Sequence, residues 1–568
     1  MKQTNPVSGD KCPINPTDRR EFLGKLGGMG LAAAAVGVGA SPGDALAQEQ
    51  ASTLPGAPPP SVTNIFQRRA RESFNLRTEQ ALAAFRATRY AHPVNGDEAL
   101  YPNRIANFSK TLPHDALGEV DLDAYHALTS AIKLERSSAF ESIPLGGTRK
   151  LANPQAAYSF QLDGVDGFAM WTPPPPRFAS EENAAEMAEI YWHSIVRDVS
   201  FADYSTSPLI AEAVADLSRF ARFSDVTSGS VFRGDSPGDR IGPYISQFLY
   251  QHIPYGPSRI PQAYSVAMSG QKFMTVYADW LAIQNGAEPP DALQIDPTVR
   301  YMRNGRDLTS YVHTDYSFQA YLNAALILLD HGDDALMVAN PYNTSSTQSG
   351  FVQFGTPHVV DMVSRAGLSA LKAAWFQKWC MHRRLRPEEM AGRVHNMKIG
   401  NANYPIHQKL LDSSSLSRLF ADNGSYLLPL AYTEGSPTHP AYPAGHATIA
   451  GACVTILKAF FNPDYVLPSP MIPTADGRAL DPYIGPALTI NDELNKLAAN
   501  IAIGRDTAGV HWRSDGVEGM RLGEKVAIAM LENYKDTYNE AFAGFSIRKF
   551  DGTDVVVGGQ PSRRNFDF

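Results

Sequence analysis

Cysteine is scarce in this chain of 568 residues, which contains only Cys12, Cys380 and Cys453. Three cysteines exclude a disulfide framework, and no Cys/His spacing typical of a zinc site occurs. Beyond the N-terminus, no segment approaches the run of about 18 apolar residues that spans a bilayer. Excess positive charge is also absent. The net charge of −8 and the isoelectric point near 6.0 argue against nucleic acid or an acidic membrane surface as partner.

Strand patterns and internal repeats are also rare, whereas helical periodicity is abundant. From about residue 185, apolar residues recur at three- and four-residue spacing, as in amphipathic helices. The predicted helices are 185–204, 264–285, 310–331, 359–386, 444–461, 489–504 and 516–538. Loops rich in Gly and Pro separate them. We therefore predict an all-α fold of packed helical bundles, with a long and partly irregular N-terminal portion.

The N-terminus has the layout of an export signal. Arg19 and Arg20 precede a weakly apolar stretch at 26–40, and Ala45-Leu46-Ala47 follows as a cleavage site. Paired arginines at this place indicate the twin-arginine route. We expect a periplasmic or extracellular protein that has no membrane segment after cleavage. The alternative is a helix that stays anchored in the membrane, but the stretch is short and rich in Gly and Ala.

The first of three basic motifs runs from Lys378 to Pro387. Lys378 and Arg386 are eight residues apart, about 80° around a helix. Because Pro387 disfavours a helical conformation at Arg386, we expect the helix to end there and Arg386 to turn back toward Lys378. Taken alone, the motif also fits a solvated basic helix face.

The second motif is Pro443-Ala444-Gly445-His446, which precedes an apolar run. Pro443 suits the first position of a new helix. The unpaired N–H groups of that first turn form an anion site, and Gly445 allows a ligand close to the backbone. His446 would project beside this site as an acid or base. A structural histidine after a turn is the alternative.

The third motif contains Arg505, Gly509, His511 and Asp515. Arg505 and His511 would lie on different sides of a continuous helix, but a bend at Gly509 brings them into one pocket. Asp515 follows His511 by four residues and can orient its imidazole by hydrogen bonding. Together the three motifs supply fixed cations, a backbone donor and two imidazoles. This set suits a tetrahedral or trigonal-bipyramidal oxyanion, and no phosphate loop, nucleophile-elbow serine or carboxylate pair accompanies it.

The order Lys-x7-Arg-Pro, Pro-x-Gly-His and Arg-x5-His-x3-Asp resembles the vanadium-dependent haloperoxidases. These enzymes share their site with the type 2 phosphatidic acid phosphatases. The step from Lys378 to Arg386, and His439 seven residues before His446, are similar to the bromoperoxidase branch. Trp375, three residues before Lys378, occurs in some members of both haloperoxidase branches. The resemblance covers about 310–535 and continues weakly upstream.

The resemblance implies a vanadate cofactor and a binding residue for each part of it. His511 would bond the vanadium, so it would be the metal ligand. Lys378, Arg386 and Arg505 would neutralise the equatorial oxygens, and the Gly445 N–H would add a donor. Electrostatic stabilisation of an oxyanion would then be combined with Lewis-acid catalysis.

The resemblance also implies the reactants and three catalytic side chains. Hydrogen peroxide would oxidise a halide to hypohalous acid, which would halogenate a small organic acceptor. His446 would manage the proton of peroxide, and Lys378 would polarise the bound peroxide. His439 is expected at the pocket rim beside His446, where it would favour bromide and iodide over chloride.

Three further residues are expected to support the site. Asp315 resembles the family aspartate that pairs with the later arginine, here Arg505, although a helix-cap role is the alternative. Trp375 is expected near the pocket, where an aromatic residue is compatible with chloride oxidation. Asp515 is expected to hold His511.

The sequence patterns and the resemblance together divide the chain into five expected parts. They are an export signal (1–47), a Pro-rich flexible leader (48–63), an N-terminal helical portion (64–300), a catalytic vanadate-binding helical domain (301–540) and a C-terminal tail (541–568). We expect a homo-oligomer that binds no nucleic acid.

One departure from the family and two other functions have to be considered. Ala444 stands where the family usually has serine, so a hydrogen bond to vanadate worth roughly 1.5–3 kcal/mol is missing. An acid phosphatase would use the same residues, with His511 as nucleophile and His446 as general acid. A secreted oxyanion-binding protein without catalysis would not need His446.

Overall fold

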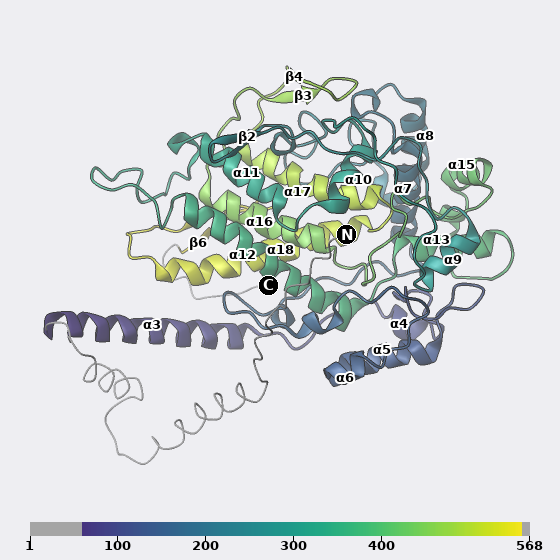
Figure 1. Ribbon diagram of the computed structural model, residues 1–568, viewed down its shortest axis with the longest axis horizontal. Helices are drawn as coiled ribbons and strands as arrows, with labels where there is room; N and C mark the ends of the chain where they lie inside the picture. Colours follow the sequence, from purple (N-terminus) through teal and green to yellow (C-terminus); the bar gives the residue numbers. More distant parts are fainter. Residues whose placement is uncertain (1–59, 559–568) are drawn as a thin grey trace, which may run out of the picture. The chain divides into compact units, whose positions relative to one another are not determined.

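The computed structural model describes residues 60–558 (Figure 1). The expected signal (1–47) and nearly all of the expected leader (48–63) lie outside the described residues. The chain divides into two units, 1–85 and 86–568. Described by itself, the first unit contributes one long helix, α3 (Pro60–Ala87). None of the helices in the described part of the chain combines the length and apolar content that a membrane crossing needs.

Helices dominate the regular secondary structure of the second unit, which confirms the predicted all-α fold. Its α-helices are α4 (Asp97–Leu100), α5 (Leu122–Leu134), α6 (Ser137–Phe140), α7 (Glu181–Val196), α8 (Pro208–Leu217), α9 (Tyr277–Gln284), α10 (Gly305–Thr314), α11 (Gln319–Asp330), α12 (Thr356–Phe376), α13 (Pro387–Lys398), α14 (Gln408–Leu411), α15 (Ser414–Asn423), α16 (Gly445–Phe460), α17 (Ile490–Thr507) and α18 (Arg513–Tyr534). The described strands form three antiparallel hairpins, β1 (Ile253–Tyr255) with β2 (Ser258–Ile260), β3 (Met471–Pro473) with β4 (Leu480–Pro482), and β5 (Phe545–Arg548) with β6 (Asp554–Val557).

The last three predicted helices agree with α16, α17 and α18 to within a few residues, but several earlier ones do not. The predicted helix 185–204 ends at Val196 in α7, and only a short 3-10 turn (Phe201–Asp203) follows. The predicted helix 310–331 is two helices, because the chain becomes extended at Asp315 after α10. Of the predicted helix 264–285, only the part from Tyr277 is helical. Its first half is extended and pairs through isolated bridges, such as Tyr264 with Arg300. Apolar spacing therefore marked buried positions correctly, but not the backbone conformation between them.

Helix α16 is the centre of the main hydrophobic core. It packs against α12, α17 and α18, and fifteen of its sixteen residues are buried (Figure 1). Small residues allow α18 to approach it closely. A Cβ at Gly523 would lie 2.0 Å from the Thr448 carbonyl oxygen, and one at Gly451 would lie 2.0 Å from that of Met520. This contact sets the start of α18 beside the start of α16.

A second hydrophobic cluster unites parts of the chain on both sides of residue 300. It combines α7 and α8 with α13, α15 and the turn after α17, and includes Trp192, Trp280 and Trp512. The segment predicted as a tail (541–568) is ordered as far as it is described. Its hairpin β5–β6 buries Phe545 and Val557 in the main core.

Candidate active site

Lys378 and Arg386 lie on either side of a sharp break in the chain. Helix α12 continues into a π-helical segment (Gln377–His382), which ends where Arg383 adopts a left-handed conformation with φ of 41°. Pro387 begins α13, and Arg386 is its extended N-cap residue. The helix therefore ends four residues earlier than we expected. Such π-helical segments are common at functional sites, and this one brings the two cations together.

The N-terminus of α16 supplies the backbone donors. Gly445 is its first residue, and Ala444 is an N-cap without a side-chain hydrogen bond. The expectation that Pro443 begins the helix is wrong, because Ala444 has an extended backbone with ψ of 126°, and its N–H donates to the Asp515 carbonyl oxygen at 2.9 Å. The first N–H groups of a helix have no intrahelical acceptor, so this end can bind an anion.

The expected bend between Arg505 and His511 is present at Gly509. Gly509 has a φ of 86°, and its N–H donates to the Asp506 carbonyl in a turn that closes α17. A Cβ at this position would lie 2.9 Å from Leu430. His511 therefore lies between α17 and α18, within the electrostatic influence of Arg505.

Lys378, Arg386 and Arg505 converge around His511, and we call these four residues the cation cluster. All four are buried, with exposed fractions of 0, 0, 4 and 2%. Arg386 Nη1 lies 3.0 Å from His511 Nε2, and Arg505 Nε is buried without a hydrogen-bond partner. Within residues 60–558, Lys378, Arg386 and Arg505 form no ion pair with a carboxylate. Instead, they donate to the main-chain carbonyls of Val312, Pro440, Ala441 and Val510 at 2.6–2.7 Å, and Arg386 also to that of His439.

Burial and mutual repulsion disfavour charge in this cluster. Burial, followed by Arg386 and Arg505, holds the pKa of Lys378 well below its ordinary value. Burial, with a smaller contribution from Arg505 and partly offset by Asp515, lowers the pKa of Arg386 to about 10. Burial and the three cations hold the pKa of His511 well below the ordinary histidine value. A bound anion would stabilise the charged forms of these bases.

His439 and Trp375 cover one side of the cluster. The His439 ring lies 4.7 Å from Trp375, and Arg386 Nη2 donates to its Nδ1 at 3.0 Å. A Cβ built at Gly445 would lie 3.5 Å from Trp375, so the indole also borders the start of α16. We expected His439 to act on His446, but within the described residues its Nδ1 lies near Arg386 Nη2 and 3.1 Å from the Pro440 carbonyl oxygen.

His446 pairs with Asp315, which corrects the expected pairing of Asp315 with Arg505. His446 Nε2 lies 3.1 Å from Asp315 Oδ1, and the two side chains are 32% and 4% exposed. Asp315 closes α10 as its C-cap residue, and its extended backbone directs the carboxylate toward α16. Arg505 instead donates to the carbonyl of Val312, one turn earlier in α10.

Asp515 holds His511, as its spacing suggested, although the two residues are not on one helix. His511 precedes α18, and its Nδ1 lies 2.8 Å from Asp515 Oδ2 in the first turn. Nδ1–H donation to an ionised carboxylate leaves the lone pair of Nε2 facing Arg386 and the cluster.

Sequence reasoning missed the residues that support Asp515. Arg384 Nη1 donates to Asp515 Oδ1 at 2.9 Å, and Nη2 donates to Glu186 Oε2 at 3.0 Å. Arg384 stands among other basic residues of one motif, so the sequence did not indicate that it differs from them in function. Glu186 lies 198 residues upstream, and no local pattern could have connected it with the site.

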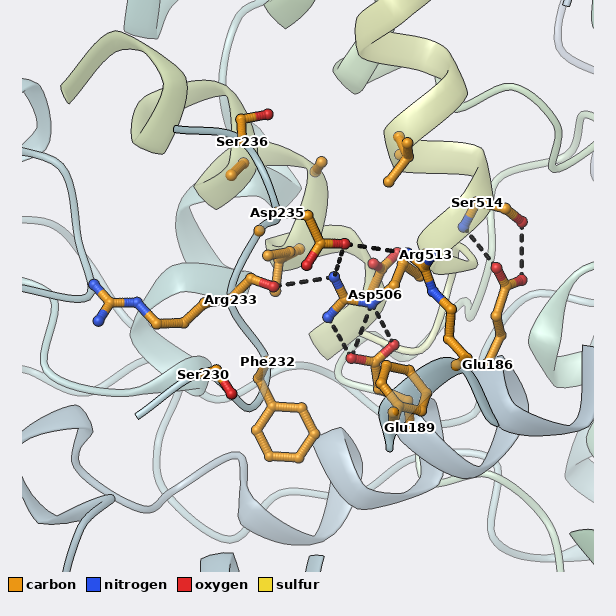
Figure 2. Close-up of a pocket in the computed structure, with 18 of the residues that line it drawn as sticks. Glu186, Glu189, Ser230, Phe232, Arg233, Asp235, Ser236, Asp506, Arg513 and Ser514 are labelled. Carbon is orange, nitrogen blue, oxygen red and sulfur yellow. Dashed lines mark hydrogen bonds and ion pairs between the residues drawn. The ribbon is translucent and has the colours of Figure 1, made fainter. Parts of the chain in front are cut away.

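A cavity of about 910 Å³ lies next to this support, lined by α7, the segment 222–240, α17 and α18 (Figure 2). Its charged groups pair largely with each other. Arg513 Nε donates to Glu189 Oε2 at 2.8 Å, and the N–H and hydroxyl of Ser514 both donate to Glu186 at 2.9 Å. We call Glu186, Glu189, Arg384, Arg513 and Asp515 the ion-pair network.

The cation cluster fits vanadate, whereas the adjacent cavity does not offer comparable groups. The cluster has a guanidinium N–H, at Arg505 Nε, that is unpartnered in the described part of the chain, and it also has a helix N-terminus and an imidazole Nε2 whose lone pair faces Arg386. Among the described residues, no set of three or more His, Cys, Asp or Glu side chains is arranged around a metal cation. The donors of the cation cluster suit an oxyanion whose central atom bonds one imidazole.

The chain is similar in sequence to known proteins. The sequence model for the VCPO second helical-bundle domain matches residues 358–540. The chain is 34% identical to the vanadium-dependent bromoperoxidase of Ascophyllum nodosum, over 86% of this chain and 94% of that protein. It is also 34% identical to the vanadium-dependent bromoperoxidase of Corallina pilulifera, over 87% of this chain and 99% of that protein.

A solved structure agrees with the sequence comparison. The homohexameric structure of the second vanadate-dependent bromoperoxidase from Ascophyllum nodosum superposes with a TM-score of 0.82 at 32% identity. The match covers 86% of this chain and 90% of that one. With this likeness over most of its length, the chain belongs to the vanadium-dependent haloperoxidase family and requires a vanadate cofactor.

Proposed function

We propose that this chain oxidises bromide or iodide with hydrogen peroxide, and chloride poorly, to a hypohalous acid that halogenates small organic acceptors. The observation that carries the proposal is the cation cluster. Three buried cations that pair with no carboxylate of the described residues surround an imidazole whose Nε2 faces them, 3.0 Å from Arg386 Nη1. Buried charge without a counter-charge is costly, so a site of this kind is stabilised by the anion it binds.

We assign vanadate binding to the cluster and to the start of α16. His511 Nε2 would bond the vanadium, while Lys378, Arg386 and Arg505 would neutralise its oxygens and the Gly445 N–H would donate to one of them. Vanadate bound there supplies a Lewis acid that activates hydrogen peroxide for attack by halide. We assign to Lys378, whose Nζ donates to two carbonyls, the role of polarising the bound peroxide.

His446 is assigned to proton transfer. It is the second residue of α16 and is partly exposed, so it can reach both the anion site and solvent. Asp315 holds its Nε2 and leaves Nδ1 for the reactants. A positioned imidazole of this kind typically contributes about 10²–10⁴-fold to a reaction that needs a proton moved.

His439 is assigned to halide preference through Arg386. The His439 ring lies beside Trp375 and accepts a hydrogen bond from Arg386. We expect this polar ring to keep water at this side of the site. We expect wild-type kcat/KM to be higher for bromide and iodide than for chloride. His439→Phe should raise the chloride-to-bromide ratio at mildly acidic pH. If the wild type oxidises chloride as well as bromide, the proposed preference is wrong.

An acid phosphatase with His511 as nucleophile is the second candidate, because phosphate and vanadate have similar shape and charge. The test is to assay the same protein for bromination, with bromide, peroxide and added vanadate, and for phosphate-ester hydrolysis. We expect bromination that depends on orthovanadate and is suppressed by phosphate. Ester hydrolysis without bromination would identify the phosphatase. Anion binding with neither activity would identify a binding protein.

We further propose a homo-oligomer. The similar bromoperoxidase of known structure is homohexameric. In this chain, α3 exposes Phe66, Phe74 and Phe85 by 59, 61 and 69%, and large exposed apolar residues on one helix are typical of an association surface. Light scattering should give a mass that is a multiple of the chain mass. A monomer at micromolar concentration would disprove the proposal.

Export through the twin-arginine route is proposed from the sequence of residues 19–47 alone. Replacing both Arg19 and Arg20 with lysine should keep the protein in the cytoplasm, because that route requires the arginine pair. Cleavage after Ala47 should be visible as a new N-terminus of the exported form. Unchanged export of the double variant would contradict the route.

A further inference from the structure

The imidazole of His511 is held by a buried chain of polar groups that ends on α7. Its Nδ1 lies 2.8 Å from Asp515 Oδ2, which also accepts the N–H of Trp512 at 3.1 Å. The other oxygen, Asp515 Oδ1, accepts from Arg384 Nη1 at 2.9 Å. The side chains of His511, Asp515 and Arg384 are 2, 0 and 3% exposed, so water does not compete with these bonds.

Arg384 is itself fixed from several directions. Its Nη2 donates to Asn183 Oδ1 at 2.8 Å and to Glu186 Oε2 at 3.0 Å, and both residues belong to α7. Its Nη1 also donates to Ser514 Oγ at 2.8 Å. The guanidinium lies 4.4 Å from the Trp512 ring centre. A planar group with several donors can satisfy all these contacts, whereas a lysine ammonium can satisfy only some of them.

The neighbouring arginine provides a contrast within the same turn. Arg383 is directed to the opposite side, where its Nη2 lies 2.5 Å from Glu98 Oε2 and its Nη1 donates to the carbonyl of Trp379. It contacts neither Asp515 nor His511. Both arginines are buried or nearly so and both are paired with a glutamate, but only Arg384 is connected with the ligand imidazole.

We propose that Arg384, anchored by Asn183 and Glu186 of α7, is a positioning residue for His511. It fixes the Asp515 carboxylate in the plane that receives Nδ1–H, and thereby keeps Nε2 directed into the cation cluster. Arg384 touches neither vanadate nor the reactants, so it acts through Asp515. The inference rests on the proposed role of His511 as the vanadate ligand.

The test compares Arg384→Gln with Arg383→Gln as a matched control. The dissociation constant for orthovanadate is measured on the apoprotein by equilibrium dialysis, together with the melting temperature. Loss of a group that orients a metal-binding histidine typically weakens affinity about 10–100-fold, and we expect this range for Arg384→Gln. Arg383→Gln should bind vanadate within about twofold of the wild type, because its contacts lie elsewhere.

Arg384→Lys keeps the charge and is the variant to use if Arg384→Gln does not fold. We expect it to fold and to weaken vanadate binding by less than Arg384→Gln. Lysine can replace the bond to one carboxylate, but not all the hydrogen bonds that the planar guanidinium donates. Wild-type affinity in Arg384→Lys, or in a folded Arg384→Gln, would overturn the inference.

Nitrogen NMR of ¹⁵N-histidine-labelled apoprotein separates positioning from general stability. The His511 signals are identified by their loss in His511→Ala. We expect a protonated Nδ1 and an unprotonated Nε2 in the wild type and in Arg383→Gln, and a mixture of tautomers in Arg384→Gln. An unchanged tautomer in Arg384→Gln would overturn the inference. If the wild type itself binds no vanadate, the proposed function fails instead.

Discussion

The cation cluster and the ion-pair network lie side by side, but their buried cations have different partners. Those of the network pair with carboxylates, whereas those of the cluster do not. In the cluster, Lys378 and Arg386 donate to carbonyls and imidazoles, and burial lowers their pKa values. In the network, Arg384 and Arg513 donate to carboxylates, which raise their pKa values although burial opposes this. His511 and Asp515 join the two regions.

This difference distinguishes a binding site from a structural support. A compensated buried pair has its charge satisfied by the fold and offers little to a ligand. An uncompensated cluster is costly in the empty protein and becomes favourable when an anion enters. In this chain the large cavity of Figure 2 adjoins the compensated network, whereas the oxyanion chemistry belongs to the cluster. Cavity size alone would therefore have indicated the wrong place.

The largest expected effect separates the two histidines of the site. His511→Ala should abolish measurable vanadate binding, because it removes the direct bond to the metal. His446→Ala should keep part of the binding but lose about 10²–10⁴-fold in turnover, as expected for a lost acid–base group. Dialysis of vanadate and steady-state bromination on both variants provide the test. Equal vanadate affinities in the two variants would contradict the division of roles.

A paired stability measurement tests the comparison itself. Arg513→Met should lower the free energy of unfolding of the apoprotein by about 3–5 kcal/mol, because it leaves the buried Glu189 charge unpaired. Lys378→Met should change it by less than about 1 kcal/mol, since relief of a desolvated cation offsets its lost hydrogen bonds. Denaturant titration measures both values. Equal losses would mean that charge compensation does not separate the two regions.

Acid should destabilise the apoprotein through its buried neutral histidines. Burial lowers the pKa of His114 to about 3, that of His382 to about 3 and that of His358 to about 4. These values lie below about 6.5 in the unfolded chain, so the unfolded state binds more protons once the pH falls below that value. Stability should fall by about 1.4 kcal/mol per pH unit for each such histidine between pH 6.5 and 4. His382→Asn should reduce the slope of the unfolding free energy against pH by the contribution of one histidine. An unchanged slope would mean that His382 does not contribute to it.

The smallest effect concerns the helix that faces the cluster. Ala444→Ser should tighten vanadate binding, with an upper expectation of about tenfold for 1.4 kcal/mol recovered. The serine hydroxyl would cap α16 and donate to an oxygen of the anion. Vanadate dialysis against the wild type measures the change. Unchanged or weaker affinity would mean that another group already serves that oxygen.

The prediction from sequence was strongest where one segment contains both the residue and its structural reason. Gly509 precedes His511 by two residues, and its bend was predictable because glycine readily adopts positive φ. The spacing of Asp515 from His511 likewise predicted their hydrogen bond. The π-helical end of α12 was not predictable, because its residues have the same apolar spacing as an ordinary helix. The partner of Asp315 was assigned wrongly because several cations and imidazoles were candidates and local spacing did not distinguish them.

By itself, the sequence determined the all-α class, the set of cationic and imidazole residues and the local bends beside them. These properties depend on periodicity and on backbone preferences within a few residues. Only the tertiary structure decided that Asp315 serves His446, that His439 contacts Arg386, and that Arg384 connects His511 with Glu186 of α7. Each of these contacts joins elements that are distant in sequence. Their choice depends on which side chains the packed core excludes from water, and that is settled only when the helices assemble.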